Sequence, residues 1–508
     1  MSFDRERIAP FIIFLFILLV YIAFLTKNYY WDGIEFAQTI ESAAALDTTL
    51  LHPNHLIYNA LGYIVYKGVL GAGIDARAVT VLQIMNSVFS AFAAFVLFHI
   101  LKESFRSTYL SAALTFVFAF SALWWKFSTD ANSYIPSILF LIIGFYLILP
   151  GKKPRPSALA AAHIAAMCFH QLAVFFFPVA ILGLYFQTAG LPRQKRFAVI
   201  AQYAALAPLV TFGIFCAAFY LQTGGFSVSV FQSWITNYSP ENGFLFNLKD
   251  CLKYTLGGEV KLFFGGRFSY LKEVLNPFLI LPIGLLMLVF IGLIIQIIRL
   301  WKTNRAAKNP DGFALSKPLA ALAAVWTAGY LAFLFFWIPQ NTFYRMFYLP
   351  ALIILTGILL NRFRLPGRTG WRTALFAAVA ALSNFLFYIY PYAQVRAETP
   401  LSMAVEMQKL WSPKTVVYYS KLESDNRLSK YFNPATVWKK LDRGVKPEEF
   451  ESEVRNVYAQ GGEVWLETWA IAQFRGQTEF AAWLARHTAA EHKVNNDAYN
   501  VEFVKVAP

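Results

Sequence analysis

The chain contains repeated apolar segments that are long enough to cross a lipid bilayer as helices. A transmembrane helix needs about 20 predominantly apolar residues, and about eleven segments approach that length by hydropathy. They lie near residues 8–25, 78–101, 108–123, 134–150, 158–169, 172–187, 198–221, 275–298, 318–338, 345–361 and 373–390. The two short segments 158–169 and 172–187 are either separate spans or one broken pair. Because backbone polar groups in hydrocarbon must be satisfied within the segment, residues 1–391 are predicted to form an all-α polytopic membrane bundle.

The charged residues indicate how this bundle is oriented. The chain has a net charge of +15 and a mean hydropathy of +0.48. With a cytoplasmic N-terminus, the predicted inner loops contain 19 basic and four acidic residues, the outer loops contain ten of each sign, and the tail after Pro391 contains fifteen of each. This one-sided excess follows the positive-inside rule of a bacterial inner or plasma membrane, so no nucleic-acid partner is needed to explain it. The first apolar run lacks a small-residue cleavage site and is expected to be a retained anchor.

Residues 392–508 have lower hydropathy than the rest and a dense, balanced charge. Short apolar runs near 415–419, 435–438, 464–468 and 499–506 predict strands, and amphipathic stretches near 426–432, 446–459 and 478–487 predict helices. The alternation predicts a small α/β domain over 392–508, separate from the bundle. An odd number of spans places this domain outside the cytoplasm. It contains no GxGxxG or Walker motif, so no nucleotide-binding role is expected.

Acids, imidazoles and single cations recur in the predicted outer loops. The candidate site residues are Asp32, Glu35, His52, His55, Lys126, Asp130, His170, Arg267 and Arg345. A carboxylate can accept a proton from a hydroxyl group, and Arg or Lys can neutralise a phosphate leaving group. Asp32 is the candidate base, because a carboxylate directly after a span is costly unless it is paired or functional. The set therefore predicts transfer chemistry on a lipid-linked phosphate.

The two longest predicted outer loops cover about 26–77 and about 222–274. In the first, Phe36–Leu46 and Leu56–Leu70 show helical spacing of apolar residues and are expected to lie in the membrane interface. The second contains glycine pairs at 224–225, 257–258 and 265–266. These pairs predict either a mobile loop that orders over a substrate or ordinary turns.

Several candidates also have a purely structural explanation. Asp32 and Glu35 would share one helix face and could form a solvated acidic cap. Lys126 could be an interfacial lysine whose stem is buried, and Asp130 could be a helix cap. Arg345 could be an anchor at the membrane boundary. Their common side of the membrane, rather than any one residue, favours the functional interpretation.

No metal site or disulfide framework is predicted. His52 and His55 have an i, i+3 spacing that permits metal binding, but Pro53 between them favours a turn. The cysteines have no zinc-type spacing, and the first two fall inside predicted spans: Cys168, Cys216 and Cys251.

Three short motifs resemble a known family. Asp32-Gly33-Ile34-Glu35 follows the first span, His52-Pro53 comes later in the first outer loop, and Thr129–Tyr134 (TDANSY) lies in the second. Together with two interfacial helices and a distal outer domain, they resemble the GT-C fold of polyprenyl-phosphate-sugar glycosyltransferases. The similarity is greatest to the protein O-mannosyltransferase branch and its bacterial relatives, and it covers the first 150 residues or so best.

The resemblance implies a reaction and roles for these residues. The first-loop acid of the family acts as general base on the acceptor hydroxyl, a role that falls here on Asp32. A second-loop acid assists acceptor or metal binding in several members and corresponds to Asp130. Gly33 separates Asp32 from a second acid, which favours a metal-independent, mannosyltransferase-like mechanism, although a divalent cation is left open. The partners implied are a polyprenyl-phosphate-linked sugar donor and an extracytoplasmic acceptor.

Two other functions compete with an inverting sugar transfer. A lipid or sugar transporter would place ionisable groups near mid-membrane, often in repeated halves, whereas the charges here lie at span ends and no repeat is found. An assembly protein would depend on residues 392–508 and would tolerate the loss of Asp32.

Overall fold

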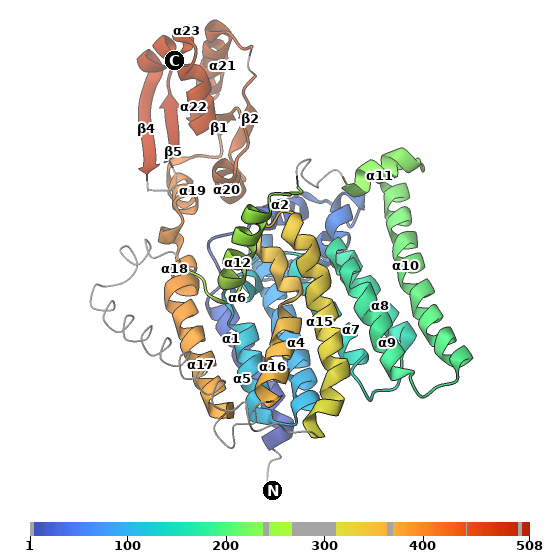
Figure 1. The fold of residues 1–508 in the computed structure, drawn as a ribbon. Coiled ribbons are helices and arrows are strands. Elements are labelled where there is room, and N and C mark those ends of the chain that lie inside the picture. The colour runs from blue at the N-terminus through green and yellow to red at the C-terminus, as the bar shows by residue number, and fades with distance from the viewer. Residues whose placement is uncertain (1–4, 237–242, 267–310, 363–368, 443, 496–499) are drawn as a thin grey trace. The chain divides into compact units, whose positions relative to one another are not determined.

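The chain forms two compact units in the computed structural model. The structure describes all residues except 1–4, 237–242, 267–310, 363–368, 443 and 496–499. The membrane unit comprises residues 1–26 and 35–391, and the sheet unit comprises residues 27–34 and 392–508 (Figure 1). The sequence prediction had assigned residues 27–34 to the bundle, whereas in the structure they group with the C-terminal residues.

The membrane unit is a bundle of apolar helices. Five described helices are long and apolar enough to cross a membrane, and the bent pair α5–α6 would make a sixth. Four shorter apolar helices accompany them. The main bundle helices are α1 (Arg5–Ala23), α4 (Ala78–Phe105), α5 (Thr108–Ala119), α7 (Tyr134–Leu147), α8 (Pro156–Phe169), α9 (Phe177–Gln187), α10 (Arg193–Thr223), α15 (Asp311–Phe336), α16 (Leu349–Arg362) and α17 (Thr369–Asn384). The chain is a multi-pass membrane protein, as predicted.

The described helices account for ten of the predicted spans, and the segment 275–298 lies outside the described residues. The two short segments of the prediction are separate helices, α8 and α9, joined by the 3-10 helix η3 (Gln171–Phe176). The predicted span 108–123 is interrupted, because the chain turns by 68° between α5 and α6 (Ala122–Ser128). This bend matters for the site, since it carries the chain from the bundle into the loop that contains Asp130.

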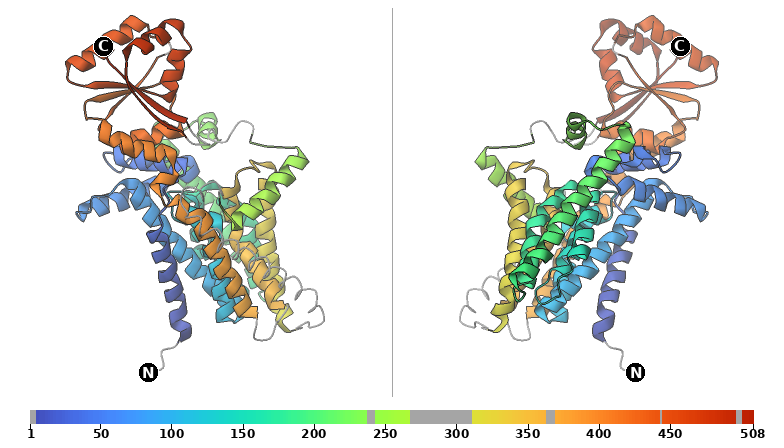
Figure 2. Two further views of the ribbon diagram at one scale, coloured as in Figure 1. Left: turned by 90° about the vertical axis from the view of Figure 1, so that its left-hand side faces the viewer. Right: turned by 90° about the vertical axis from the view of Figure 1, so that its right-hand side faces the viewer.

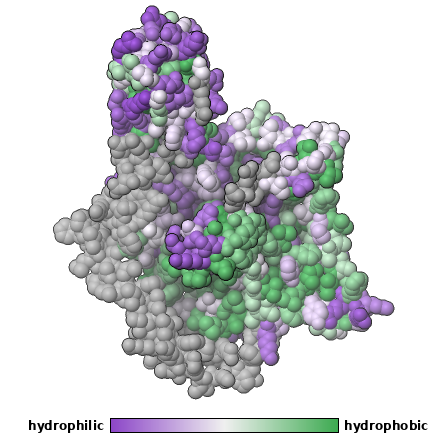
Figure 3. Space-filling view, turned by 45° about the horizontal axis from the view of Figure 1, so that its top comes forward, coloured by the Kyte–Doolittle hydropathy of each residue, from purple (hydrophilic) through white to green (hydrophobic). Residues whose placement is uncertain are grey.

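Helix α4 lies at the centre of the bundle and α10 lies at its edge. In α4, 61% of the apolar window is buried, against 22% in α10. Small residues such as Ala91 and Ala94 let α1, α5 and α7 pack closely against α4. On the face drawn in Figure 3, hydrophobic residues cover much of the described bundle, as expected for contact with lipid.

Two short helices follow α1, close to the stretches predicted to lie in the interface. They are α2 (Trp31–Ser42) and α3 (Tyr58–Gly71), with 3-10 helices η1 (Thr48–Leu50) and η2 (Pro53–His55) between them. Glu41 of α2 holds the start of α4 through two hydrogen bonds from Arg77, of 2.9 and 2.8 Å, and one from the backbone of Ala78. The second long loop contributes α11 (Val228–Thr236) and α12 (Leu248–Phe263).

The sheet unit is a five-stranded mixed sheet of order β2-β1-β3-β5-β4 (Figure 2). Its strands are β1 (Thr415–Tyr419), β2 (Val437–Lys440), β3 (Glu463–Glu467), β4 (Thr488–Asn495) and β5 (Asn500–Val506). Strand β1 pairs in parallel with β2 and β3, whereas β5 pairs antiparallel with β3 and β4. The predicted α/β class is confirmed, but β4 was missed, because its sequence TAAEHKVN lacks a strong apolar alternation.

Helices cover both faces of this sheet. They are α19 (Thr399–Leu410), α20 (Ser424–Phe432), α21 (Pro447–Ala459), α22 (Thr468–Arg475) and α23 (Thr478–His487). Val416 and Tyr418 of β1 pack with residues of α21, α22 and α23, whereas Val417 between them packs with Met403 and Met407 of α19. This division follows from the alternation of side chains along a strand, and it gives the unit two hydrophobic layers of its own.

Candidate functional site

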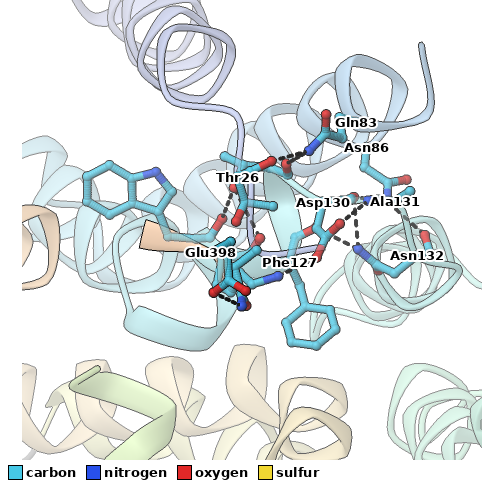
Figure 4. Close-up of polar contacts among 12 residues, drawn as sticks. Thr26, Gln83, Asn86, Phe127, Asp130, Ala131, Asn132 and Glu398 are labelled. Carbon is cyan, nitrogen blue, oxygen red and sulfur yellow. Dashed lines mark hydrogen bonds and ion pairs between the residues drawn. The ribbon is translucent and has the colours of Figure 1, made fainter. Parts of the chain in front are cut away.

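A buried ion pair occupies the loop after the α5–α6 bend. Lys126 on α6 pairs with Asp130, four residues later, and their side chains are only 7% and 0% exposed. The other carboxylate oxygen of Asp130 accepts a hydrogen bond of 2.8 Å from the backbone N–H of Ala131 (Figure 4). Removing two charges from water costs several kcal/mol per ion unless each is compensated, so this pairing is what allows both residues to lie inside the protein.

Two amide side chains of α4 fix this loop. Gln83 donates to the carbonyl oxygens of Thr26 and Thr129, at 2.8 and 2.9 Å. Asn86 donates to the carbonyl oxygens of Asp130 and Asn132, at 2.7 and 2.8 Å (Figure 4). Since buried carbonyl groups need partners, these amides hold the turn against α4, the most buried of the long helices that the structure describes.

Sequence reasoning missed Gln83 and Asn86, although a signal was present. Both interrupt an apolar span, and with Ser87 and Ser90 they form a polar face at positions i, i+3, i+4 and i+7. Ser87 and Ser90 also bond to the α6 terminus, through the carbonyl oxygen and the hydroxyl group of Ser128. A polar stripe inside a span indicates a face turned toward buried polar groups.

Three of the predicted histidines lie in one neighbourhood of the membrane unit. The His52 and His55 rings are stacked, with centroids 4.2 Å apart and planes at 13°. His55 also interacts electrostatically with His170, although more than a hundred positions separate them in the chain. Burial lowers the pKa of His52 to about 4 and that of His170 to about 3, so both rings are neutral near pH 7.

His52 and His170 play the same local role. The Nδ1 atom of His52 accepts a hydrogen bond of 3.3 Å from the backbone N–H of Asn54, at the start of η2. The Nδ1 atom of His170 accepts one of 3.2 Å from Leu172, at the start of η3. Each ring therefore caps a 3-10 helix, in the manner of a side-chain acceptor at a helix N-terminus.

Aromatic rings connect these groups. The Tyr134 ring, at the start of α7, contacts Phe127, His170 and Phe343, with centroids 5.8, 4.9 and 5.5 Å away. Phe343 belongs to η7 (Thr342–Phe347), which also carries Arg345. Phe127 of α6, His170 and Phe343 of η7 therefore meet around one ring, and apolar contacts of this kind exclude water and strengthen nearby electrostatic interactions.

Arg345 lies deep in the membrane unit and is fully buried. Its guanidinium donates to Glu259 of α12 at 3.2 Å, to the Tyr348 hydroxyl at 3.1 Å and to the carbonyl oxygen of Pro339 at 3.1 Å. Helix α12 packs on both η7 and α6, so it covers the elements that carry Arg345 and Lys126. Sequence reasoning missed Glu259, which is 86 positions away from its partner.

The remaining predicted residues are placed as follows. Asp32 and Glu35 lie on α2, three positions apart and therefore on one face of the helix; Asp32 is half-buried and Glu35 is exposed. Asp32 belongs to the residues grouped with the sheet unit, and Glu35 belongs to the membrane unit. Arg267 lies outside the described residues. Among the residues that the structure describes, no group of three His, Cys, Asp or Glu side chains is arranged to hold a metal ion.

The membrane unit also contains an apolar cavity of about 350 Å³. It lies among α8, η3, α10 and α11, and its lining includes Met167, Val174, Phe212, Phe215 and Ile235. A cavity of this size and character suits a hydrocarbon chain better than a polar ligand.

Comparison with known proteins identifies the fold. No family profile matches the chain, and no curated protein matches it in sequence. The structure of ArnT from Cupriavidus metallidurans bound to undecaprenyl phosphate matches with a TM-score of 0.59 and 10% identity, over 99% of this chain and 98% of that one. The apo structure of the same protein matches with a TM-score of 0.60 and 11% identity, over 97% of each chain. The chain therefore has the polytopic membrane fold of these ArnT structures, in agreement with the fold that the sequence resemblance implied.

Proposed function

We propose that this chain is a membrane glycosyltransferase that moves a sugar from a polyprenyl-phosphate carrier to an extracytoplasmic acceptor. The observation that carries the proposal is the fold match over nearly the whole chain to ArnT, one of whose structures binds undecaprenyl phosphate. The acceptor is a protein, a lipid or a glycan. A transporter is disfavoured, because buried charges such as Lys126 and Asp130 are paired at the end of a short helix rather than spread along a path through the bundle.

The reaction would proceed with inversion at the sugar. The acceptor hydroxyl oxygen attacks the anomeric carbon while the bond from that carbon to the phosphate oxygen breaks, and the bond's electron pair leaves with the phosphate. Asp32 takes the hydroxyl proton as general base, and its place in the first turn of α2 supports this role because the side chain is only half-buried and can meet a ligand. Lys126, Arg267 or Arg345 would stabilise the charge on the departing phosphate.

The other predicted residues would form the pocket for sugar and acceptor. Support comes from three contacts: His170 packs on the Tyr134 ring, His55 interacts electrostatically with His170, and Asp130 interacts with Tyr58. Glu35 and His52 would line the entrance. The carrier's isoprenoid chain would lie in the apolar cavity beside α10.

The proposed setting is the bacterial inner membrane, with the N-terminus in the cytoplasm and the sheet unit outside. This orientation is supported by the basic residues of the predicted inner loops. Labelling of single cysteines introduced at position 35 and at position 152 with a membrane-impermeant reagent in intact cells tests it. Reaction at position 152 rather than at position 35 would reverse the orientation.

Replacing Asp32 tests the chemistry. Purified protein is supplied with undecaprenyl-phosphate-linked sugars and a membrane fraction as acceptor, and the release of undecaprenyl phosphate is measured. Asp32→Asn should lower turnover by about 10²- to 10⁴-fold, the range for a general base, with unchanged donor binding. Glu41→Gln on the same helix makes the same change of charge and should retain activity. Normal turnover by Asp32→Asn would remove Asp32 from the base role.

A further inference from the structure

The ion pair between Arg345 and Glu259 leaves the guanidinium incompletely satisfied. Only one carboxylate oxygen contacts it, at 3.2 Å from Nη1. The Nε atom is buried and has no hydrogen-bond partner within the described part of the chain. Charge-assisted bonds are usually 2.7 to 2.9 Å long, and arginine pairs best when it donates two parallel bonds to one anion. Glu259 is therefore a weak partner for a fully buried cation.

Another arginine of the same unit provides a direct comparison. Arg77 donates from both Nε and Nη2 to Glu41, at 2.9 and 2.8 Å, in the paired geometry that Arg345 lacks. The Arg77 side chain is 33% exposed, so it needs such compensation less than Arg345 does. The better geometry thus occurs where it is needed less, which indicates that Arg345 is not arranged primarily for its carboxylate partner.

The two partners also differ in their freedom to move. The Arg345 side chain is 1% exposed, whereas that of Glu259 is 31% exposed and can turn toward water. The α12 backbone lies directly on the guanidinium: a Cβ atom at Gly258 would be 2.2 Å from Nε. Only a glycine permits this approach, so a modest shift of α12 would uncover Nε together with the position held by Glu259.

We propose that the Glu259 carboxylate and the phosphate of a polyprenyl-phosphate compete for Arg345. A phosphate offers two oxygens at once, one for Nε and one for Nη1, which is the paired arrangement that Glu259 does not provide. Glu259 then determines how tightly the lipid phosphate binds. It neutralises the buried Arg345 in the absence of the lipid and is displaced by the more highly charged phosphate. This inference rests on the proposed use of a lipid-phosphate carrier.

Binding of undecaprenyl phosphate to the full-length protein in nanodiscs tests the competition. Glu259→Gln keeps the shape of the side chain and removes its charge, and it should tighten binding by about three- to tenfold, the equivalent of the net worth of one hydrogen bond. In the double variant Glu259→Gln/Arg345→Gln, the loss of the Glu259 charge should no longer tighten binding relative to Arg345→Gln alone. Tyr348→Phe removes the hydroxyl that donates to Glu259 and should tighten binding to a lesser degree. It is a second variant that tests the same competition.

Controls separate the possible outcomes. Glu41→Gln, which breaks the ion pair between Glu41 and Arg77, should leave the affinity for undecaprenyl phosphate unchanged. Unchanged or weaker binding by Glu259→Gln, with normal binding by the wild-type protein, would overturn the competition alone. Failure of the wild-type protein to bind the lipid would overturn the carrier proposal and this inference with it. Inorganic phosphate is titrated in parallel, and tightening with that ion but not with the lipid would overturn the assignment to a lipid-linked phosphate.

Discussion

The buried pair of Lys126 and Asp130 leads to a prediction about stability. Asp130→Asn preserves the size of the side chain and an oxygen for the Ala131 N–H, but it leaves the Lys126 ammonium without its carboxylate. Removing one partner of a buried pair costs about 3 to 5 kcal/mol, because the remaining charge is desolvated without compensation. The upper part of this range applies here, since the side chains are 7% and 0% exposed. The free energy of unfolding in detergent, measured by denaturant titration, should fall accordingly.

The double variant Lys126→Met/Asp130→Asn completes the cycle. It removes both charges, so it should be more stable than either single variant, with a coupling energy above about 1 kcal/mol. A cost below about 1 kcal/mol for Asp130→Asn, or a double variant no more stable than the singles, would refute the assignment of this pair as a mutually compensated buried interaction. Turnover adds a second result: stability that recovers without activity would mean that these charges also contact substrate.

Two further predictions concern other parts of the membrane unit. Gly258→Ala should destabilise the protein by about 1 to 3 kcal/mol, because its Cβ would lie 2.2 Å from Arg345 Nε and would force α12 outward. Thermal unfolding measures this change. Gly257→Ala is the matched control, because its Cβ would meet nothing within 4 Å. Acid should destabilise the native protein through His52 and His170, whose native pKa values of about 4 and about 3 lie below the ordinary 6.5. The unfolded chain then binds protons more readily, so this contribution is complete above about pH 6.5. It is lost as the pH falls toward 4 for His52 and toward 3 for His170, by at most about 3 and about 5 kcal/mol. Unfolding titrations of His52→Asn and His170→Asn against pH should show a shallower loss.

The architecture could be predicted because each part of it follows from local sequence. The apolar runs, the change of composition after Pro391 and the alternation of strand and helix patterns each depend on neighbouring residues only. Strand β4 was missed where that local signal fails: its stability comes from pairing with β5 along its length. The bend between α5 and α6 was missed for a similar reason, because an apolar run gives no sign of direction.

The partners within the site could not be predicted, since they depend on contacts between distant parts of the chain. Nothing near Arg345 in the sequence points to Glu259, and nothing near His55 points to His170. Gln83 and Asn86 could have been predicted as structural residues of the site, because two amide side chains in an apolar span need hydrogen-bond partners inside the protein. The role of Asp32 stays a prediction, which the experiment on Asp32→Asn addresses.

The capping of η2 and η3 by histidine determines where the protons on two imidazoles are. A backbone N–H that donates to Nδ1 requires a lone pair there, so in the neutral ring the single hydrogen of His52 and of His170 must be on Nε2. Both rings can then offer a hydrogen to an oxygen of a bound molecule, but neither has a basic nitrogen left with which to remove one. Two short turns of the backbone therefore leave these two imidazoles as hydrogen-bond donors, and a base for the proposed reaction has to be another group, such as the carboxylate of Asp32.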